Sequence, residues 1–235
     1  MTTRTRNQDA PPPPDSSAQV FALKDCALIA IATGRRASTL TELRDNLEQV
    51  SADSVYFHFW GGLLEPRFEE REYNNDFAAW ARHGLHDGIL AERLAMLDPT
   101  QLDDIEELRQ ALLDDIDARL DESEYLSWVR ATRRFEFIRS QIVVFDTHRR
   151  LRQPEELARL MPDLSTSSIF YHFVDARRRQ PDRRDDFSVW LDGFGDAYRV
   201  LSDRLAGVDP YFGSLSELRQ QLASLLAADP PGAAP

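Results

Sequence analysis

The sequence predicts an all-α fold made of two homologous helical bundles in tandem. The main observation is a phrase that occurs twice, since residues 51–59 read SADSVYFHF and residues 165–173 read STSSIFYHF. Apolar residues near the end of each half also recur at three-and-four spacing, which is typical of an amphipathic helix. A chain of 235 residues with 42% hydrophobic residues is long enough to bury a substantial core.

The duplication extends well beyond the repeated phrase. His58 and His172 lie 114 positions apart, and other identical pairs keep this spacing. After the histidines the spacing falls to 110, because NDFAAW at 75–80 answers DDFSVW at 185–190. A change of length marks a loop. Further matching pairs are Phe21 with Phe135, Thr33 with Thr147, Arg35 with Arg149, Arg36 with Arg150, Glu42 with Glu156, Ser54 with Ser168, and Trp80 with Trp190.

These matches define the expected segments, which we arrange about a pseudo-two-fold axis. The linker should carry Trp128 into the interface between the two repeats. The tails are low in complexity, so we expect them to be disordered. In chain order the segments are a Pro-rich tail at 1–20, a helical repeat at 21–120, a helical linker at 121–134, a second helical repeat at 135–228 and a tail at 229–235.

The opening segment of each repeat, residues 21–36 and 135–150, is the most ambiguous part of the chain. The run of Ile142, Val143 and Val144 suits a buried strand as well as it suits a helix. We favour a helix for both segments.

The segments that follow carry clearer helix signals. Thr39 with Glu42 has the form of a capping box, and Pro154 stands at a first helical position in the second repeat. Ser51 and Ser165 stand where N-caps would start the repeated histidine segment. Longer amphipathic helices are expected over residues 77–97, 105–120 and 215–225.

Composition argues against several classes of protein. No apolar run approaches the roughly 20 residues needed to cross a bilayer, and the N-terminus has no secretory signal, so we expect a cytoplasmic protein without membrane contact. Cys26 is the only cysteine, so an internal disulfide and a thiolate cluster for a metal are ruled out. Because motifs such as HExxH and Gly-x-Ser-x-Gly are missing as well, we expect neither a cofactor nor a metal.

The charge distribution differs between the two halves. The chain has a net charge of -12, which argues against nucleic acid as a partner. Residues 21–120 hold 10 basic and 20 acidic side chains, whereas residues 135–228 hold 13 and 14. A group of arginines in the second half either meets an anionic partner or forms a solvated loop. Its members are Arg177, Arg178, Arg179, Arg183 and Arg184.

The repeated phrase resembles the recognition helix of tetracycline-repressor-type regulators, in which a Ser-x-x-Ser-Leu-Tyr-x-His-Phe run enters the major groove. The resemblance covers about twenty residues in each copy and implies a DNA-binding helix-turn-helix. The sequence departs from that pattern at Leu47 to Gln49, where the family has small residues, and it lacks the lysine that follows His-Phe. Asp53 would also place a carboxylate near phosphates.

A second resemblance covers both repeats from end to end. The opening Phe, the Arg pair, the Ser-x-x-x-His run and the Asn/Asp-Asp-Phe-x-x-Trp run are similar to an uncharacterised bacterial family, a domain of unknown function. That family usually has a second histidine two positions after the first. Trp60 and Val174 stand there in this chain. The resemblance implies a fold unit and no particular activity.

Two pairs of side chains and a set of arginines are the candidate site residues. His58 with Asp76, and His172 with Asp186, form expected imidazole–carboxylate pairs that fix a tautomer. Such pairs either link the short helix to the long one or belong to a site. The arginines of the opening segments, Arg35, Arg36, Arg149 and Arg150, either bind a phosphate or carboxylate or neutralise the C-terminus of the first helix.

From these features we predict a non-catalytic binding or regulatory protein that acts through protein partners or a small anionic ligand. The alternatives are a DNA-binding transcription regulator and, third, a hydrolase-type enzyme built on the two histidine–aspartate pairs. The oligomeric state is not fixed by the sequence. The candidate binding residues are His58, Asp76, His172, Asp186, Arg35, Arg36, Arg149, Arg150, Arg177 and Arg178.

Overall fold

Each repeat opens with a long β-strand and not with the helix that we favoured from the sequence. The computed structural model describes residues 20–64, 72–211 and 213–228. In it, β1 (Phe21–Ala37) pairs with β2 (Phe135–Leu151) as a two-stranded antiparallel sheet. The all-α prediction is therefore wrong, because the described chain combines helices with a sheet. Paired residues of the two strands lie 98 to 130 positions apart, from Ala37 with Phe135 to Phe21 with Leu151, a relation that a local sequence pattern cannot reveal.

Helices follow each strand. Those of the first half are α1 (Leu40–Leu47), α2 (Ala52–Trp60), α3 (Asp76–His83), α4 (Gly88–Ala95) and α5 (Ile105–Asp121), with a short 3-10 turn, η1 (Gly61–Leu63), after α2. Those of the second half are α6 (Pro154–Leu160), α7 (Thr166–Ile169), the π-helix η4 (Phe170–Asp175), α8 (Ala176–Arg179), α9 (Asp186–Asp192), α10 (Arg199–Ala206) and α11 (Leu215–Ala228), with 3-10 turns η3 (Met161–Asp163) and η5 (Asp196–Tyr198).

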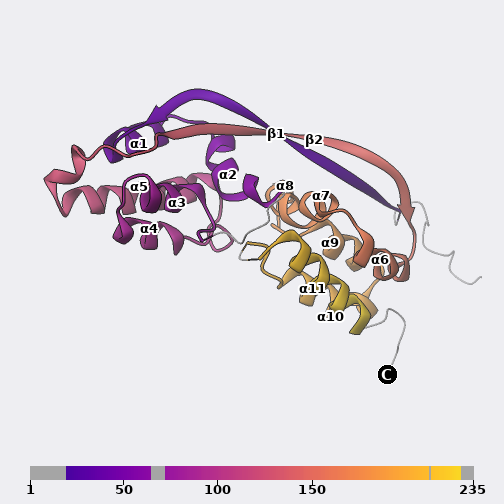
Figure 1. Ribbon diagram of the computed structural model, residues 1–235. Coiled ribbons are helices and arrows are strands. Elements are labelled where there is room, and N and C mark those ends of the chain that lie inside the picture. Colours follow the sequence, from indigo (N-terminus) through magenta and orange to yellow (C-terminus); the bar gives the residue numbers. More distant parts are fainter. Residues whose placement is uncertain (1–19, 65–71, 212, 229–235) are drawn as a thin grey trace, which may run out of the picture.

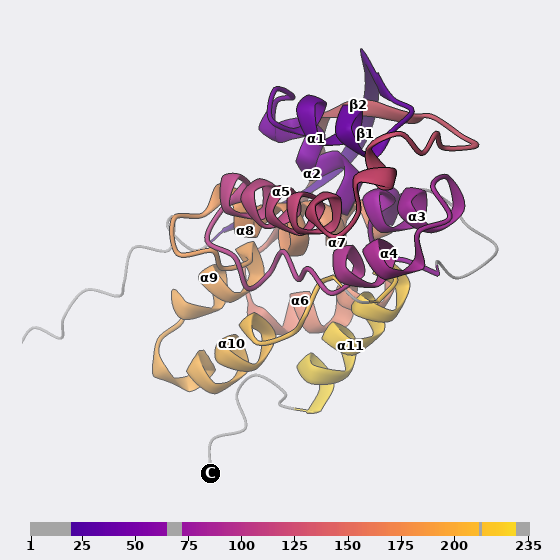
Figure 2. The same ribbon diagram turned by 90° about the vertical axis from the view of Figure 1, so that its left-hand side faces the viewer.

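The ribbon of two strands arches over both groups of helices, and the strands run in opposite directions along it (Figure 1). β1 begins above the second-half helices and ends at α1, whereas β2 begins above the first-half helices and ends at α6. Seen from the side, the ribbon lies along one face of the helices (Figure 2). Each strand therefore starts beside the helices of one half and ends at the first helix of the other half.

The first residue of each strand completes the core of the opposite half. Phe21 lies 5.5 Å from Phe187, measured between ring centroids, although Phe187 belongs to α9. Phe135 stacks on Phe77 of α3 with a centroid distance of 5.0 Å. Each half therefore buries an aromatic ring that the other half supplies, and such rings dominate the apolar area of a core.

The register of the ribbon carries the same symmetry as the sequence repeat. Phe21 pairs with Leu151, and moving these positions by 114 residues gives Phe135 and Ala37, which also pair. The register shifts twice, once towards each end of the ribbon.

The repeated threonines sit at these two shifts. Thr147 donates its hydroxyl to the carbonyl of Leu23 at 2.6 Å, and Thr33 donates to the carbonyl of Phe137 at 2.7 Å. A bulge leaves backbone groups without a partner on the facing strand. The hydroxyls satisfy two of these carbonyls, which explains why threonine occurs at both positions.

The connection between the halves differs from the predicted linker. After α5 the chain forms a short 3-10 helix, η2 (Glu124–Ser127), and then irregular structure. Trp128 is 82% exposed, so the prediction that it packs into an interface is wrong. The predicted tails lie outside the described residues, apart from Val20. Of the helices in the described ranges, none combines the length and the apolar character needed to cross a membrane.

Cys26 should be chemically inert in the folded chain. Its thiol is buried on β1 and donates to the carbonyl of Ser167 at 3.4 Å. Burial, assisted by the nearby Asp25 carboxylate, raises the pKa of the thiol to about 12. Since the thiolate is the reactive form, we expect a thiol reagent such as Ellman's reagent to modify Cys26 at pH 8 only after denaturation. Rapid modification of the native chain would contradict this placement.

Candidate functional site

The repeated Ser-x-x-x-His phrase holds a strand of the opposite half. Ser54 donates its hydroxyl to the carbonyl of Ile138 at 2.8 Å, and the Nε2 atom of His58 accepts the backbone N–H of the same residue at 3.1 Å. The two side chains can share one target because residues four apart lie on one face of a helix. Together they satisfy both backbone polar groups that Ile138 turns away from β1.

The second copy makes the same contacts with β1. Ser168 donates to the carbonyl of Lys24 at 2.9 Å, and Nε2 of His172 accepts the Lys24 N–H at 2.9 Å. Lys24 and Ile138 are themselves 114 positions apart. We call these two arrangements the strand clamps; they fix each strand to the helices of the other half.

The carboxylates expected from the sequence orient both imidazoles. Nδ1 of His58 lies 2.9 Å from Asp76, and Nδ1 of His172 lies 2.8 Å from Asp186. Because Nε2 accepts a backbone N–H in each case, Nδ1 carries the proton and donates it to the carboxylate. The imidazoles are 3% and 2% exposed. Neither ring has a free nitrogen for proton transfer or for a metal, so the geometry gives no support to the hydrolase reading.

The burial of the residues around the histidines likewise gives no support to the hypothesis that these segments bind DNA. Seven consecutive residues of α2, from Ser54 to Trp60, are buried. A recognition helix must present such side chains to base edges in a groove. Here they face the ribbon, the core and the boundary with the second half.

Stability should depend on pH through His172. Burial lowers its pKa below the ordinary value of 6.5, and this outweighs the opposing effect of Asp186; Arg179 and Lys24 lower it further. As the pH drops below 6.5, the imidazole of His172 becomes protonated in the unfolded chain while it stays neutral in the folded chain. The free energy of unfolding therefore falls as the pH drops below 6.5.

A His172→Gln variant tests this directly. It should lose about 1–3 kcal/mol at pH 7.5, because a clamp bond and the partner of Asp186 are disturbed. It should also show a weaker pH dependence than the unsubstituted chain between pH 6.5 and 5. Urea denaturation at several pH values measures both effects, and an unchanged profile would show that the imidazole does not titrate on unfolding.

The arginines of the opening segments lie on the ribbon. Arg36 pairs with Glu136 at 3.0 Å, and Arg150 pairs with Asp146 at 2.6 Å. Arg35 donates to side-chain oxygens of α1 and the turn after it, while Arg149 is exposed. The suggestion that they neutralise the end of a first helix is wrong, because the segment is a strand. None of them lines the pocket described next.

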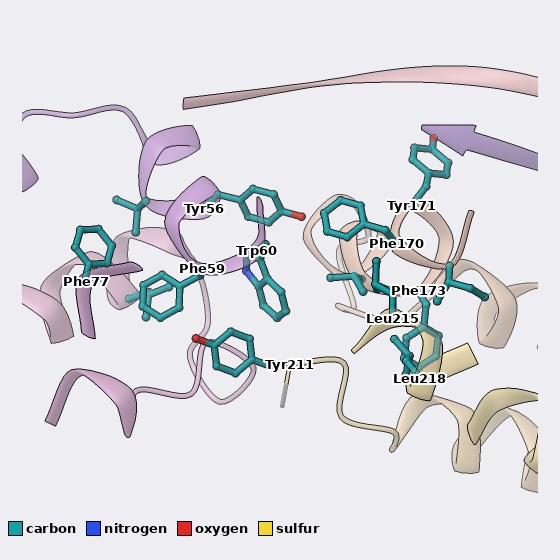
Figure 3. Close-up of a cluster of buried hydrophobic side chains, with 14 of the residues drawn as sticks. Tyr56, Phe59, Trp60, Phe77, Phe170, Tyr171, Phe173, Tyr211, Leu215 and Leu218 are labelled. Carbon is teal, nitrogen blue, oxygen red and sulfur yellow. The ribbon is translucent and has the colours of Figure 1, made fainter. Parts of the chain in front are cut away.

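A pocket of about 670 Å³ opens between the two halves. One wall comes from α2 and from the loop that leads into α5, and the other comes from α8 and the residues after it. Figure 3 shows Tyr56 pointing from α2 toward the second half and Tyr211 lying beside Trp60. The residues that define the walls are Tyr56, Trp60, Thr100, Asp103, Asp104, Ile105 and Glu106 on one side, and Arg177, Arg178, Gln180, Arg183 and Pro210 on the other.

Arg177 is a half-buried cation of this pocket. Its Nη2 atom donates to the carbonyls of Ala206 and Val208 at 3.0 and 2.8 Å, and its guanidinium lies 4.8 Å from the Phe173 ring centroid. Its Nε–H is shielded from solvent and has no acceptor among the described residues. Burial also lowers the pKa of Arg177. A guanidinium in this state gains from an additional acceptor.

Two further arginines join the halves at the same place. Arg178 lies over the Tyr56 ring, 4.8 Å from its centroid, and binds Asp175 at 3.0 Å. Tyr56 donates its hydroxyl to the same carboxylate at 3.3 Å across the boundary between the halves. Arg183 donates to the carbonyl of Thr100 at 3.1 Å.

The backbone around these arginines is irregular. The π-helix of residues 170–175 ends two residues before Arg177, whereas the corresponding part of α2 is a regular α-helix. Arg183 has a φ of 57°, in the left-handed region that side chains rarely adopt. Both features are common at functional sites, and both occur here in the second half.

The acidic side chains at the pocket already have partners or face solvent. Asp104 caps α5 by accepting the N–H groups of Glu106 and Glu107 at 2.8 and 2.9 Å. Glu106 binds Arg109 at 2.7 Å. Asp103 is 97% exposed at its side chain and lies 3.6 Å from Arg183.

The two halves differ at the pocket and agree at the clamps. At the 114-residue spacing, Arg177 corresponds to Leu63 and Arg178 to Leu64. The shared residues explain the common scaffold, so the unshared residues are the better candidates for a specific role. Sequence reasoning singled out Arg177 and Arg178 but missed the aromatic wall, which the mismatches within the repeat would have revealed. Other unmatched pairs at or beside the pocket include Tyr56 with Phe170, Trp60 with Val174, and Gly61 with Asp175.

Comparisons with known proteins give the family and the fold. A profile described as a family of unknown function, DUF5752, matches residues 18–227. OrfY from Thermoproteus tenax has a similar structure, with a TM-score of 0.76 and 23% sequence identity over 90% of this chain and 95% of that one. No curated protein matches. At this identity the likeness to OrfY shows a common fold and nothing more.

Proposed function

We propose that this chain, which belongs to the DUF5752 family of unknown function, is a non-catalytic binding protein that takes a small anionic ligand in the pocket between its halves. The observation that carries the proposal is the half-buried Arg177 guanidinium at this pocket, whose Nε–H has no acceptor among the described residues. Arg178 and Arg183 line the same pocket. A cytoplasmic location and an origin by internal duplication are part of the proposal.

The lining favours binding over catalysis. Among the described residues, those that line the pocket include no histidine and no cysteine, and the nitrogen atoms of His58 and His172 are occupied by the strand clamps and by Asp76 and Asp186. Arginine is suited to bind carboxylates and phosphates through paired N–H groups, but it does not exchange protons near neutral pH. The walls come from both halves, and pockets at such boundaries are common ligand sites.

The proposal is tested by thermal denaturation of the full chain with a panel of small anions and their uncharged analogues. A ligand that binds only the folded state raises the midpoint temperature. We expect anions to do so for the unsubstituted chain and much less for Arg183→Gln. The matched control is Arg150→Gln, which removes a similarly ion-paired arginine from the ribbon. If no anion stabilises the chain at millimolar concentration, or if both variants respond alike, the proposal fails.

A further inference from the structure

The geometry points to an organic phosphate as the ligand, with its phosphoryl group held by Arg177, Arg178 and Arg183 and its uncharged part against Tyr56 and Trp60. This inference rests on the proposed function and narrows it to one chemical class. It also predicts that one ligand contacts both halves at once.

The number of available N–H groups favours phosphate over carboxylate. Arg177 retains Nη1 beyond its two carbonyl bonds and its shielded Nε–H, and Arg178 retains Nη1 beyond its bonds to Asp175. One guanidinium fork already satisfies a carboxylate, which has two oxygens in one plane. A phosphate monoester has three terminal oxygens and a charge of about −1.5 to −2 at pH 7. Three guanidiniums around one pocket suit that group.

The opposite wall determines what the rest of the ligand is. Asp104 and Glu106 lie there, and a second anionic group near them would be repelled. Carboxylates accept hydrogen bonds from hydroxyl groups, and Tyr56 and Trp60 offer aromatic surface. The remainder of the ligand therefore carries no second negative charge, and a ring or hydroxyl groups suit this wall. A volume of about 670 Å³ lies in the middle of the range for small-molecule sites.

The phosphoryl group would also bind next to an internal contact between the halves. Arg178 binds Asp175, and Tyr56 donates to the same carboxylate from the other half. A phosphate that takes up free N–H groups of Arg178 acts directly at this junction. Binding at this place should change the environment of Trp60, which lines the pocket.

The test is isothermal titration of the full chain with phenyl phosphate, benzoate, benzyl alcohol and inorganic phosphate. We expect phenyl phosphate to bind at least tenfold more tightly than benzoate and inorganic phosphate, and we expect benzyl alcohol not to bind. Arg178→Gln and Arg183→Gln should each weaken phenyl phosphate about tenfold, whereas Arg150→Gln should not. Circular dichroism establishes that the variants fold, and Arg177 is left intact because it holds the carbonyls of Ala206 and Val208.

The outcomes separate this inference from the proposed function. Equal binding of benzoate and phenyl phosphate overturns the phosphate assignment and leaves an anion site. Equal binding of inorganic and phenyl phosphate overturns the role of Tyr56 and Trp60. If benzoate, inorganic phosphate and phenyl phosphate all fail to bind, both the inference and the proposed function are wrong.

Discussion

Replacing Phe135 with alanine should lower the free energy of unfolding by about 3–5 kcal/mol, the cost usual for truncating a buried phenylalanine. Phe135 is 5% exposed. It stacks on Phe77, contacts Trp80 with a centroid distance of 5.8 Å, and lies 4.7 Å from the imidazole of His58. All three partners belong to the other half, so the cavity opens in the first-half core although the substitution is in β2.

The matched control is Phe145→Ala on the same strand. Phe145 is 51% exposed, so its truncation should cost less than about 1 kcal/mol. Urea denaturation followed by circular dichroism measures both variants. A loss for Phe145→Ala equal to that for Phe135→Ala would mean that the change acts through strand propensity, and the exchange of strands between halves would lose its main support.

Much of the local structure could be predicted from short-range patterns. Thr39 caps α1 by accepting the N–H of Glu42, and the Glu42 side chain reaches back to accept the N–H of Ser38, one residue before the N-cap. Pro154 opens α6. These features depend on residues three or four apart, so a single segment contains all the information needed. The histidine–aspartate pairs were also found, because both copies carry them at matching positions.

The two strands, unlike the helices, could not be assigned from short-range sequence patterns. β1 contains Ala22, Ala27, Ala30 and Ala32, residues that favour helices, and its partner lies far away in the chain. What stabilises it as a strand is pairing with β2 and the two clamps. Both are long-range contacts, so the helix preference of the isolated segment was overridden by tertiary structure.

The pocket could be predicted from the sequence only in part. Arg177 and Arg178 attracted attention because charge clusters are visible in a sequence. Tyr56 and Trp60 were assigned to a repeated core phrase and not to a site. Tyr56 and Trp60 line a pocket only because the second half lies against them, and that arrangement depends on the exchange of strands between the halves. The unshared residues of a duplicated chain are therefore the place to look for specific binding.

Cutting the connection between the halves should leave the molecule in one piece. A specific protease site inserted at Tyr125, which is 74% exposed in the short η2 turn, makes the cut possible without touching the core. After cleavage, the fragments should elute together in size-exclusion chromatography and separate only in denaturant. The reason is that β1 and β2 pair along the ribbon and each clamp binds the strand of the other fragment.

The same two fragments expressed separately should not fold as monomers. The first would lack Phe135 and Phe137, so Phe77 and His58 would lose ring contacts that β2 supplies. The second would lack Phe21, whose ring lies 4.8 Å from His172. Each separate fragment would also lack the opposite strand that completes its clamp. The Nε2 atom of its histidine and the hydroxyl of its clamp serine, Ser54 or Ser168, would then have no backbone partner.

We expect each separate fragment to give no cooperative thermal transition as a monomer, and we expect mixing the two to restore the transition of the full chain. Two independent bundles joined by a tether would behave in the opposite way: the cleaved fragments would part on the column, and each would unfold cooperatively alone. That result would contradict the exchange of strands and, with it, the placement of the pocket between two halves that the ribbon holds together.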